Sequence, residues 1–174
     1  MNLKVRETPF KERWKYTSAK KVFNLNLKSM ERSPDFNGSE QPGVTITDKP
    51  NHRVLELTSH KIINEKIFMI SKAKYPILIE ITKTLAKPLE INYPSTCAPL
   101  FLFISDGVSC QINEYFEGGE DQHQAIWLEL GSNSEVAHTR RSLIEDVNEW
   151  KYLYALQDRD SYYELHSHNV GGSL

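Results

Sequence analysis

The stretch "LFISDGVSCQINEYF", residues 102–116, has two counterparts further along the chain. They are "LELGSNSEVAHTRRS" (128–142) and "YALQDRDSYYELHSH" (154–168), each offset by 26 residues from the one before. In every stretch a strand ends in an aliphatic residue, a polar turn follows, and an alternating strand resumes. The aliphatic ends are Ile104, Leu130 and Leu156, and the turns are Asp106-Gly107, Ser132-Asn133 and Asp158-Arg159.

A fixed period of this length is the signature of stacked repeats, in which each unit buries its apolar face against its neighbours. The segments between the turns, 123–130 and 149–156, are also aliphatic and aromatic, so each repeat holds two strands. Two strands per repeat suit a β-solenoid or a two-sheet sandwich, and β-hairpins with Asp-Gly turns also recur by chance. We favour the solenoid and expect a mainly β fold.

Strand patterns also precede these stretches. Alternating or β-branched runs predict strands at 43–47, 53–57, 76–85, 88–93 and 99–105. The segment 60–73 suits a short helix or two strands, 33–43 is a loop by its Pro, Gly, Asn and Ser content, and 8–30 predicts a turn and a helix. The chain therefore divides into an N-terminal helical or loop segment (1–42) and a β-rich domain (43–174).

The composition is that of an ordinary soluble domain. The chain has 174 residues, of which 39% are hydrophobic and 25% charged, and a formal net charge of -2. This charge argues against a dedicated nucleic-acid binder, which is normally basic. The sequence has no apolar stretch of bilayer-spanning length and no signal peptide, and its two cysteines form no disulfide framework. We therefore expect a cytoplasmic protein with reduced thiols and no membrane partner.

The charge is unevenly distributed along the chain. Residues 1–28 hold eight basic and two acidic residues, whereas residues 114–164 hold four basic and twelve acidic residues. A bipolar chain of this kind can present two faces to different partners. Ordinary solvated surface is the simpler explanation.

Trp14, Lys15 and Tyr16 form a basic aromatic patch near the start of the chain. Aromatic rings beside lysines can stack on bases and contact phosphates, so a nucleic-acid arm is one interpretation. A membrane anchor is another, but the patch is short and has no continuous apolar face. We favour the third interpretation, in which the aromatic rings pack beneath the first repeat and the lysines stay in water.

The segment "ERWKYTSAKKV" (12–22) resembles the Trp-(Lys/Arg)-Tyr-Thr segment of the SufB/SufD family, the paired scaffold subunits of the SUF iron–sulfur cluster assembly system. "INEYFEGG" (112–119), "GSNSEVAH" (131–138), "YALQ" (154–157) and "HNVGGSL" (168–174) resemble the early turns of the β-helix of that family. The order and spacing are more similar to SufD than to SufB. The likeness covers nearly the whole chain and is best over 8–23 and 100–174.

The resemblance implies a right-handed parallel β-helix that acts as a non-catalytic scaffold with SufB-like and SufC-like subunits, SufC being an ABC-type ATPase. It implies no stably bound cofactor, with an iron–sulfur cluster or Fe²⁺ present only transiently in the complex. Family members are usually more than twice this length, so we expect a truncated β-helix whose open end can self-associate. The later turns and the family's functional residues lie in the part not matched, so the resemblance supplies no catalytic residue.

His138, His166 and His168 are the candidates for a metal site. His166 and His168 lie two residues apart on a predicted strand, so both imidazoles point to one face. With His138 on a neighbouring repeat, and with Glu114 and Glu164 nearby, they could bind iron or zinc. The rival to a scaffold is therefore a small all-β metal-binding module or enzyme of jelly-roll type, although alternation also produces surface histidines in this pattern.

Cys97 and Cys110 are the two thiols that could accept sulfur or ligate a cluster. Cys110 alternates with Val108 and Ile112, which predicts an inward-facing small hydrophobe. Cys97 precedes a strand on a loop, which predicts the more exposed thiol. The sequence has no Walker A motif, dinucleotide fingerprint, nucleophile elbow or His-Glu-x-x-His motif.

Overall fold

A computed structural model describes residues 33–48, 76–95, 97–117, 122–142 and 149–169. These residues form ten strands and no helix, which confirms the mainly β fold class. The strands are β1 (Asp35–Asn37), β2 (Val44–Thr47), β3 (Ile77–Ile81), β4 (Leu89–Tyr93), β5 (Leu100–Ile104), β6 (Ser109–Phe116), β7 (Gln122–Leu130), β8 (Glu135–Ser142), β9 (Glu149–Gln157) and β10 (Tyr162–Asn169).

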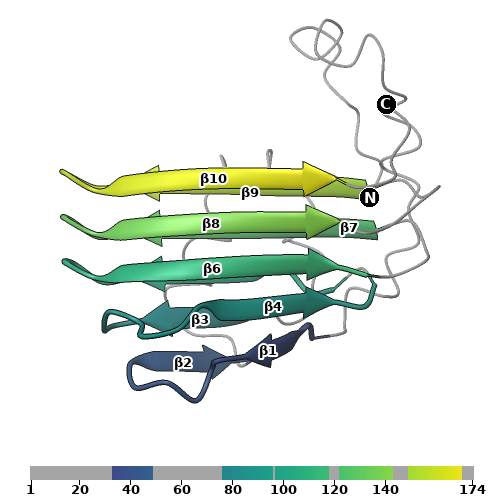
Figure 1. Ribbon diagram of the computed structural model, residues 1–174, viewed down its shortest axis with the longest axis horizontal. Coiled ribbons are helices and arrows are strands. Elements are labelled where there is room, and N and C mark those ends of the chain that lie inside the picture. Colours follow the sequence, from purple (N-terminus) through teal and green to yellow (C-terminus); the bar gives the residue numbers. More distant parts are fainter. Residues whose placement is uncertain (1–32, 49–75, 96, 118–121, 143–148, 170–174) are drawn as a thin grey trace, which may run out of the picture.

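The strands form two mixed, mostly parallel sheets. Sheet A has the order β1-β4-β6-β8-β10, and sheet B has the order β2-β3-β5-β7-β9. From β3 onward, consecutive strands belong to opposite sheets, and each strand pairs in parallel with the strand two further along the chain. We call each consecutive pair a level: β3–β4 is level 1, β5–β6 level 2, β7–β8 level 3 and β9–β10 level 4 (Figure 1).

The register between levels confirms one predicted offset and corrects the other. Levels 2 and 3 pair at an offset of 26, as in Ser109 opposite Glu135. Levels 3 and 4 pair at 27, as in Glu135 opposite Tyr162. The connection from β8 to β9 is one residue longer than that from β6 to β7, which shifts all of level 4. The aliphatic end Leu156 therefore pairs with Glu129, and Gln157 occupies the position opposite Leu130.

The turns between sheet B and sheet A repeat the same backbone conformation. Gly107, Asn133 and Asp160 all have positive φ angles, of 67°, 56° and 56°. Gly and Asn adopt this left-handed region most easily, and Asp is also enriched there. Hydrogen bonds join the turns of successive levels, from Gly107 N to Ser132 O (2.9 Å) and from Asn133 N to Arg159 O (3.0 Å). The predicted third turn, Asp158-Arg159, lies one residue before the observed turn at Arg159-Asp160, because the connection from β8 to β9 is one residue longer than that from β6 to β7.

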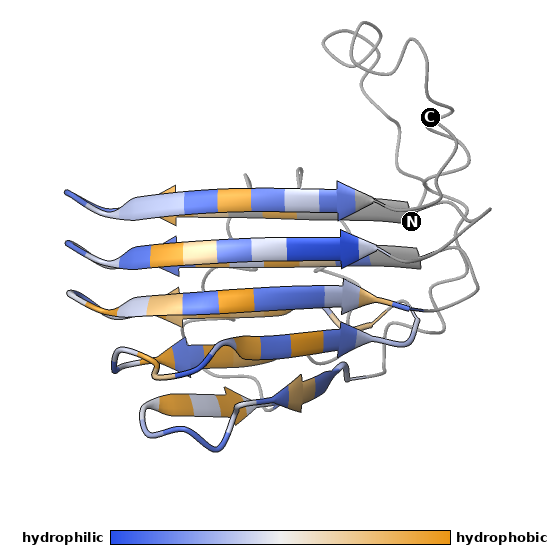
Figure 2. Cartoon of the chain, viewed as in Figure 1, coloured by the Kyte–Doolittle hydropathy of each residue, from blue (hydrophilic) through white to orange (hydrophobic). Residues whose placement is uncertain are grey.

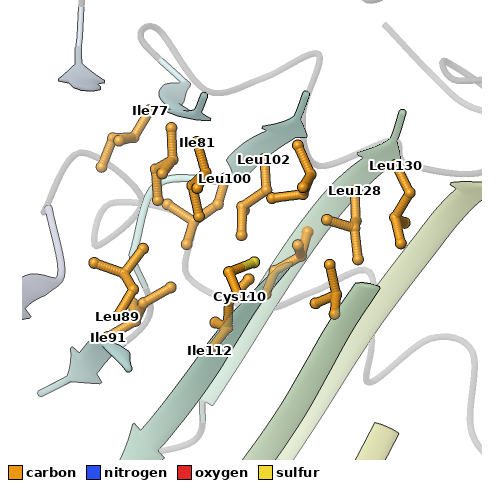
Figure 3. Close-up of a cluster of buried hydrophobic side chains, with 14 of the residues drawn as sticks. Ile77, Ile81, Leu89, Ile91, Leu100, Leu102, Cys110, Ile112, Leu128 and Leu130 are labelled. Carbon is orange, nitrogen blue, oxygen red and sulfur yellow. The ribbon is translucent and has the colours of Figure 1, made fainter. Parts of the chain in front are cut away.

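The core lies between the two sheets. Alternate residues of each strand point inward, so Ile81, Leu102 and Leu128 of sheet B meet Ile91, Cys110 and Ile112 of sheet A (Figure 3). Figure 2 shows the resulting alternation of hydrophobic and hydrophilic residues along the strands. Large apolar residues also lie on the outward face of sheet B, beside Glu80 and Glu129. Its outward-facing Leu78, Phe101, Phe103 and Trp127 are buried as well.

The two ends of this stack of levels differ. At one end β1 and β2 pair antiparallel with β4 and β3, and Phe36, Val44 and Ile46 pack against the core. At the other end, no described strand pairs with the outer edges of β9 and β10 (Figure 1). The large exposed hydrophobic residues of the described part, Leu156, Tyr162 and Leu165, all belong to level 4. Among the residues that the structure describes, one end of the stack is therefore capped and the other is open.

The predicted strands at 43–47, 88–93, 99–105, 123–130 and 149–156 are confirmed with small changes of bounds, whereas the strand predicted at 76–85 is confirmed only over Ile77–Ile81. The segment 33–43 is not wholly a loop, because Asp35–Asn37 forms β1. The expected helix in 8–30, the strand at 53–57 and the helix or strands in 60–73 lie outside the described residues, as do Trp14, Lys15 and Tyr16. In the ranges described, no helix has the length and apolar character that a membrane crossing requires.

Candidate functional site: a buried polar cluster

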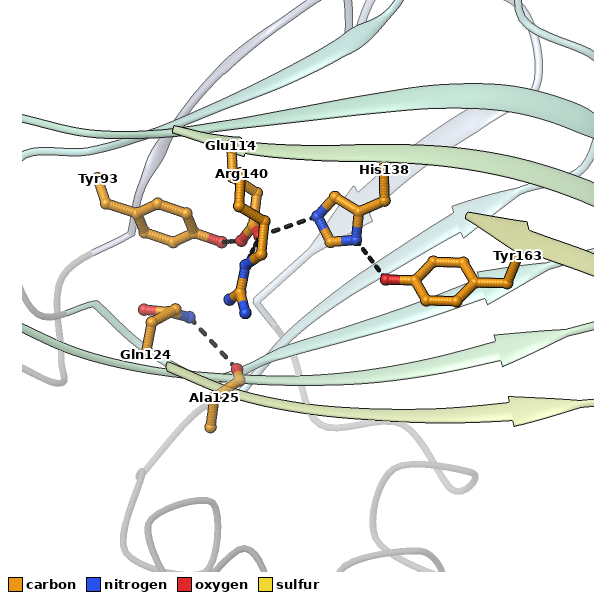
Figure 4. Close-up of polar contacts among 7 residues, drawn as sticks. All are labelled: Tyr93, Glu114, Gln124, Ala125, His138, Arg140 and Tyr163. Atoms are coloured by element: carbon orange, nitrogen blue, oxygen red, sulfur yellow. Dashed lines mark hydrogen bonds and ion pairs between the residues drawn. The ribbon is translucent and has the colours of Figure 1, made fainter. Parts of the chain in front are cut away.

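Five polar side chains form a column through the core. Tyr93 belongs to level 1, Glu114 to level 2, His138 and Arg140 to level 3, and Tyr163 to level 4 (Figure 4). Strand alternation places these residues on the inner face, where Glu114 and Arg140 lie directly opposite one another in the β6–β8 ladder. Glu114 and His138 have no exposed surface, and Arg140 is 4% exposed. We call these five residues the polar column.

Glu114 is the centre of the polar column. Its Oε1 accepts a hydrogen bond from Tyr93 Oη (2.7 Å), and its Oε2 accepts one from His138 Nε2 (2.8 Å) and another from Arg140 Nε. An ionised carboxylate has no proton to donate, so His138 carries its proton on Nε2. Both oxygens of the buried carboxylate are therefore satisfied by three donors, one from β4 and two from β8.

His138 connects Glu114 to the open end of the stack. Its Nδ1 lies 2.8 Å from Tyr163 Oη on β10, and the two rings are tilted at 60° with centroids 6.0 Å apart. Nδ1 and the Tyr163 hydroxyl lie within hydrogen-bonding distance of each other. Both ring nitrogens of His138 thus have protein partners.

The charges of the cluster shift the acidity of its members. Burial alone would raise the pKa of Glu114, but the charge of Arg140, the charge of His138 and hydrogen bonds from His138 and Tyr93 lower it from 4.5 to about 2. Burial raises the pKa of Tyr93 well above its ordinary value, and the nearby Glu114 carboxylate adds to that shift. Burial also raises the pKa of Tyr163. Glu114 is therefore ionised and both tyrosines are neutral at pH 7.

Two buried polar atoms beside the column have no hydrogen-bond partner among the described residues: Arg140 Nη2 and Gln124 Oε1. Gln124 lies on β7, and its Nε2 donates to Ala98 O (3.1 Å) and Ala125 O (3.3 Å). The guanidinium carbon of Arg140 lies 5.8 Å from the centroid of the Phe116 ring, which supplies a cation–π contact. These atoms lie in the packed core, in contrast to the solvent-facing polar groups of a catalytic cleft.

The polar column lies apart from the two hollows on the described surface. Two hollows of about 290 and 280 Å³ lie on the described surface, and no member of the column lines either of them. The first lies by Lys83 and Lys87, and the second by Cys110 and Tyr162. The hydrogen bonds of the column join residues of all four levels, so the column helps to hold the levels in register.

The structure separates the three histidines that the sequence suggested as a metal site. His138 is buried and pairs with Leu165 in the ladder, whereas His166 and His168 pair with Thr139 and Arg141 and are exposed on the outer face of sheet A. The 27-residue offset is the cause, because a shift of one residue moves every side chain of a strand to the opposite face. In the described ranges no group of three His, Cys, Asp or Glu side chains is placed to hold a metal ion.

The carboxylates considered with these histidines are divided in the same way. Glu114 binds His138 in the core, and Glu164 forms an ion pair with His166 on the surface, with 2.9 Å between Glu164 Oε1 and His166 Nε2. Both side chains of the surface pair are about half exposed. Each carboxylate therefore has one histidine partner, and neither set has a metal-site geometry.

Both cysteines are buried, which confirms the prediction for Cys110 and corrects that for Cys97. Cys97 is 1% exposed and packs in the inter-sheet core, with Sγ 3.3 Å from Ser95 O. The connection from β4 to β5 crosses between the sheets, so its small residues are enclosed although they form no strand. Burial raises the pKa of Cys110 to about 12. Neither thiol is exposed in the way that a sulfur acceptor requires.

The sequence indicated Glu114 and His138 but missed Arg140, Tyr93 and Tyr163. A signal was present: Glu114 and Arg140 stand at the same position of two stretches offset by 26 residues, so one level places an acid directly beneath a base. Tyr93 and Tyr163 could not be found in this way, because level 1 pairs with level 2 at an offset of 23 and level 4 pairs with level 3 at 27.

Comparisons with known proteins add no relative to this picture. A scan against protein-family models, a search of curated proteins and a search of solved structures each found no match. The function must therefore be argued from the arrangement of the levels and from the sequence motifs themselves.

Proposed function

We propose that this chain is a SufD-like scaffold in iron–sulfur cluster assembly and that its levels are the first turns of a right-handed parallel β-helix. In this proposal the chain performs no chemistry. It holds a SufB-like subunit and a SufC-like ABC ATPase in position, and ATP hydrolysis takes place in the latter. We place the protein in the cytoplasm, with no nucleic-acid or membrane partner.

The observation that carries the proposal is the ladder β6–β8–β10. The three stretches that share the repeat pattern lie side by side in parallel at successive levels, in sheet A. Consecutive strands alternate between the sheets, so each repeat contributes one strand to each sheet and contacts mainly its neighbours. This arrangement supports a stacked-repeat scaffold with extended surfaces for partners.

The enclosed polar column favours the scaffold over the metal-binding alternative. Both ring nitrogens of His138 already have partners, Glu114 and Tyr163, and His166 and His168 lie on the other face of the sheet. A jelly roll is built from antiparallel strands, whereas the ladders between levels are parallel. We accordingly propose no resident cofactor, and an iron–sulfur cluster or Fe²⁺ would be cargo of the complex.

Affinity capture tests this proposal. The tagged chain, co-expressed with SufB-like and SufC-like subunits, is expected to retain both through a wash at about 0.5 M salt, a concentration that screens non-specific charge contacts. Circular dichroism of the captured chain checks that it is folded. A folded chain that retains neither subunit contradicts the proposal.

Metal analysis supplies the opposing test. The purified chain alone is expected to contain no stoichiometric iron or zinc, and His166→Ala is expected to change nothing in that measurement, because His166 is a surface residue paired with Glu164. One tightly bound ion per chain, lost in His166→Ala, would instead support the metal-binding module.

A further inference from the structure

The larger of the two hollows, of about 290 Å³, lies where two turns meet at the capped end of the stack. One is the turn from β1 to β2 (38–43), and the other is the turn from β3 to β4 (82–88). Sites for drug-sized ligands occupy about 300–1,000 Å³, so a hollow of this size suits a small molecule. We call it the turn hollow.

Hydrogen bonds hold the two turns together. Gln41 Nε2 donates to Lys87 O (3.0 Å) and to Gly38 O (2.8 Å), and Gln41 Oε1 accepts a hydrogen bond from Lys87 N (2.9 Å). Thr82 N donates to Gly43 O (2.8 Å). The walls of the turn hollow are therefore fixed before a ligand arrives, and a preformed site loses less free energy to ordering when it binds.

Close packing brings Lys83 against the first turn. Gly43 has a φ of 94°, and a Cβ built on it would lie 2.7 Å from Lys83 Cβ and 2.9 Å from Lys83 N. The second turn is also tied to level 2, because Ser109 N donates to Thr84 Oγ1 (3.1 Å) and Leu85 N donates to Ser109 O (3.1 Å). Lys83 and Lys87 thus extend from the same fixed turn.

The charged groups of the turn hollow are two ammonium groups and one carboxylate. Lys83 and Lys87 are exposed, and no ion pair among the described residues includes either of them. Glu40 is the one acidic residue among those that line the hollow. The chain as a whole has a net charge of -2, so the positive charge is a local property of this site. Lysine ammonium groups bind phosphate as point charges.

The lining also has an apolar part. Pro42 and Ala86 lie in the wall of the turn hollow, and the lysine side chains add their methylene groups. A ligand that contacts both parts of the lining has a strongly anionic group and a short carbon chain.

We propose that the turn hollow binds a small phosphate ester, with Lys83 and Lys87 at the phosphate group and Pro42 and Ala86 against the carbon atoms. A phosphate monoester carries a charge of about −1.5 to −2 at pH 7, which two ammonium groups balance better than they balance a single carboxylate. The Glu40 carboxylate repels the phosphate group and so limits the affinity.

Titration of the full chain with glycerol 3-phosphate tests the site. The amide NMR signals of Thr84 and Lys87 are expected to move and to saturate with a Kd of about 1 mM at low salt. Sodium chloride of equal ionic strength is the reference and is expected to move neither signal. Signals that do not saturate below about 50 mM, or that move equally in sodium chloride, would overturn the inference.

Inorganic phosphate and acetate identify the chemistry that is recognised. Inorganic phosphate lacks the carbon atoms that contact Pro42 and Ala86, so it is expected to bind severalfold more weakly than the ester. Acetate carries a single charge and is expected to bind about tenfold more weakly than the ester. Acetate as tight as the ester would overturn the assignment to phosphate, and inorganic phosphate as tight as the ester would overturn the assignment to an ester.

Lysine variants locate the site. Lys83→Gln combined with Lys87→Gln is expected to weaken binding of the ester about tenfold or more. Arg141→Gln combined with Arg159→Gln is the matched control, because it removes two exposed positive charges on level 3 and at the turn of level 4. The control is expected to bind as the original chain does. An equal loss in both double variants would show general charge attraction and overturn the site.

Glu40→Gln tests the same arrangement in the opposite direction. Removal of the one carboxylate in the lining is expected to tighten binding of the ester about threefold. Glu135→Gln on the outer face of β8 removes an equal charge elsewhere and is expected to change nothing. Circular dichroism confirms that each variant is folded. A Glu40→Gln variant that binds the ester more weakly would overturn the proposed arrangement of charges.

This site goes beyond the proposed scaffold function, and the two proposals can fail separately. A chain that captures SufB-like and SufC-like subunits but binds no phosphate ester retains the proposed function and loses the site. A chain that binds the ester through Lys83 and Lys87 but captures neither subunit retains the site and loses the scaffold assignment.

Discussion

Glu114 is an ionised carboxylate held in the core by donors from Tyr93, His138 and Arg140. Its pKa is lowered to about 2 in the folded chain, against 4.5 ordinarily. A group with a depressed folded pKa stabilises the fold above its unfolded pKa and loses that contribution as the pH falls toward the folded pKa. We expect the urea midpoint to fall between about pH 5 and pH 2, by an amount equivalent to roughly 3 kcal/mol.

Glu114→Gln separates this residue from the other carboxyl groups. The amide cannot neutralise Arg140, so the variant is expected to lose about 3–5 kcal/mol of unfolding free energy at pH 7. The variant is also expected to show a flatter pH dependence below pH 5. Glu135→Gln on the exposed face is the control and should stay within about 0.5 kcal/mol. An equal pH slope in the original chain and Glu114→Gln would contradict the role of Glu114.

The thiols give a second prediction at the residue scale. Cys97 and Cys110 are both buried, and the pKa of Cys110 is raised to about 12. Because the thiolate is the reactive species, neither cysteine is expected to react with a thiol reagent within minutes at pH 8 in the folded chain. Both should react at once in denaturant. Rapid modification of one thiol in the native protein would show an accessible cysteine.

These residues also show what the sequence could predict at this scale. Cys110 was predicted to face inward because strand alternation decides its face, and alternation can be read from Val108 and Ile112. Cys97 was predicted to be exposed because it lies outside a strand, where periodicity gives no information. Its burial depends on the path of the connection between the sheets, which only the assembled core determines.

At the scale of the element, the turns between the sheets repeat with different residues. Gly107, Asn133 and Asp160 share a positive φ, and a Cβ built on Gly107 meets no atom within 4 Å. Gly131, by contrast, lies against the turn below it, where a Cβ would lie 2.7 Å from Asp106 N and 2.8 Å from Ser105 C. Gly107 therefore suits its position through its dihedral angle, which Asn and Asp also adopt at the equivalent positions, whereas Gly131 is required by close packing between levels.

These two positions should respond differently to substitution. Gly107→Asn is expected to cost less than about 1 kcal/mol, because Asn133 already occupies the equivalent position at level 3. Gly131→Ala is expected to cost about 2 kcal/mol or more, because the methyl group must displace backbone atoms of Asp106 and Ser105. Urea denaturation of both variants measures the difference. An equal cost would contradict close packing between levels as the reason for Gly131.

Register is the property of the elements that the sequence predicted least well. A constant offset of 26 gave the pairing of β6 with β8, but the extra residue between β8 and β9 moved β10 by one position. That single residue turned His166 and His168 away from His138. A repeat can be recognised from aligned stretches, but an inserted residue in a connection leaves no trace in strand periodicity.

At the scale of the whole molecule, the levels differ in how many neighbours they have. Levels 2 and 3 lie between others, level 1 is covered by β1 and β2, and level 4 has one described neighbour. In stacked structures, stability is a sum of contributions from each unit and its interfaces, so an open terminal unit opens most easily.

Hydrogen exchange tests this difference. Amides of β10 are expected to exchange faster than those of β6, because β10 has one described neighbouring strand and β6 has two. Equal exchange in β6 and β10 would contradict the open end.

The antiparallel strands β1 and β2 define one end of the stack of levels. They run against β4 and β3 and so interrupt the parallel ladders below level 1, whereas β9 and β10 continue these ladders. A further parallel level beyond β10 would change the height of the protein without altering its cross-section. The Glu114 carboxylate on level 2 would stay at the same distance from β1 and β2 however many levels followed level 4.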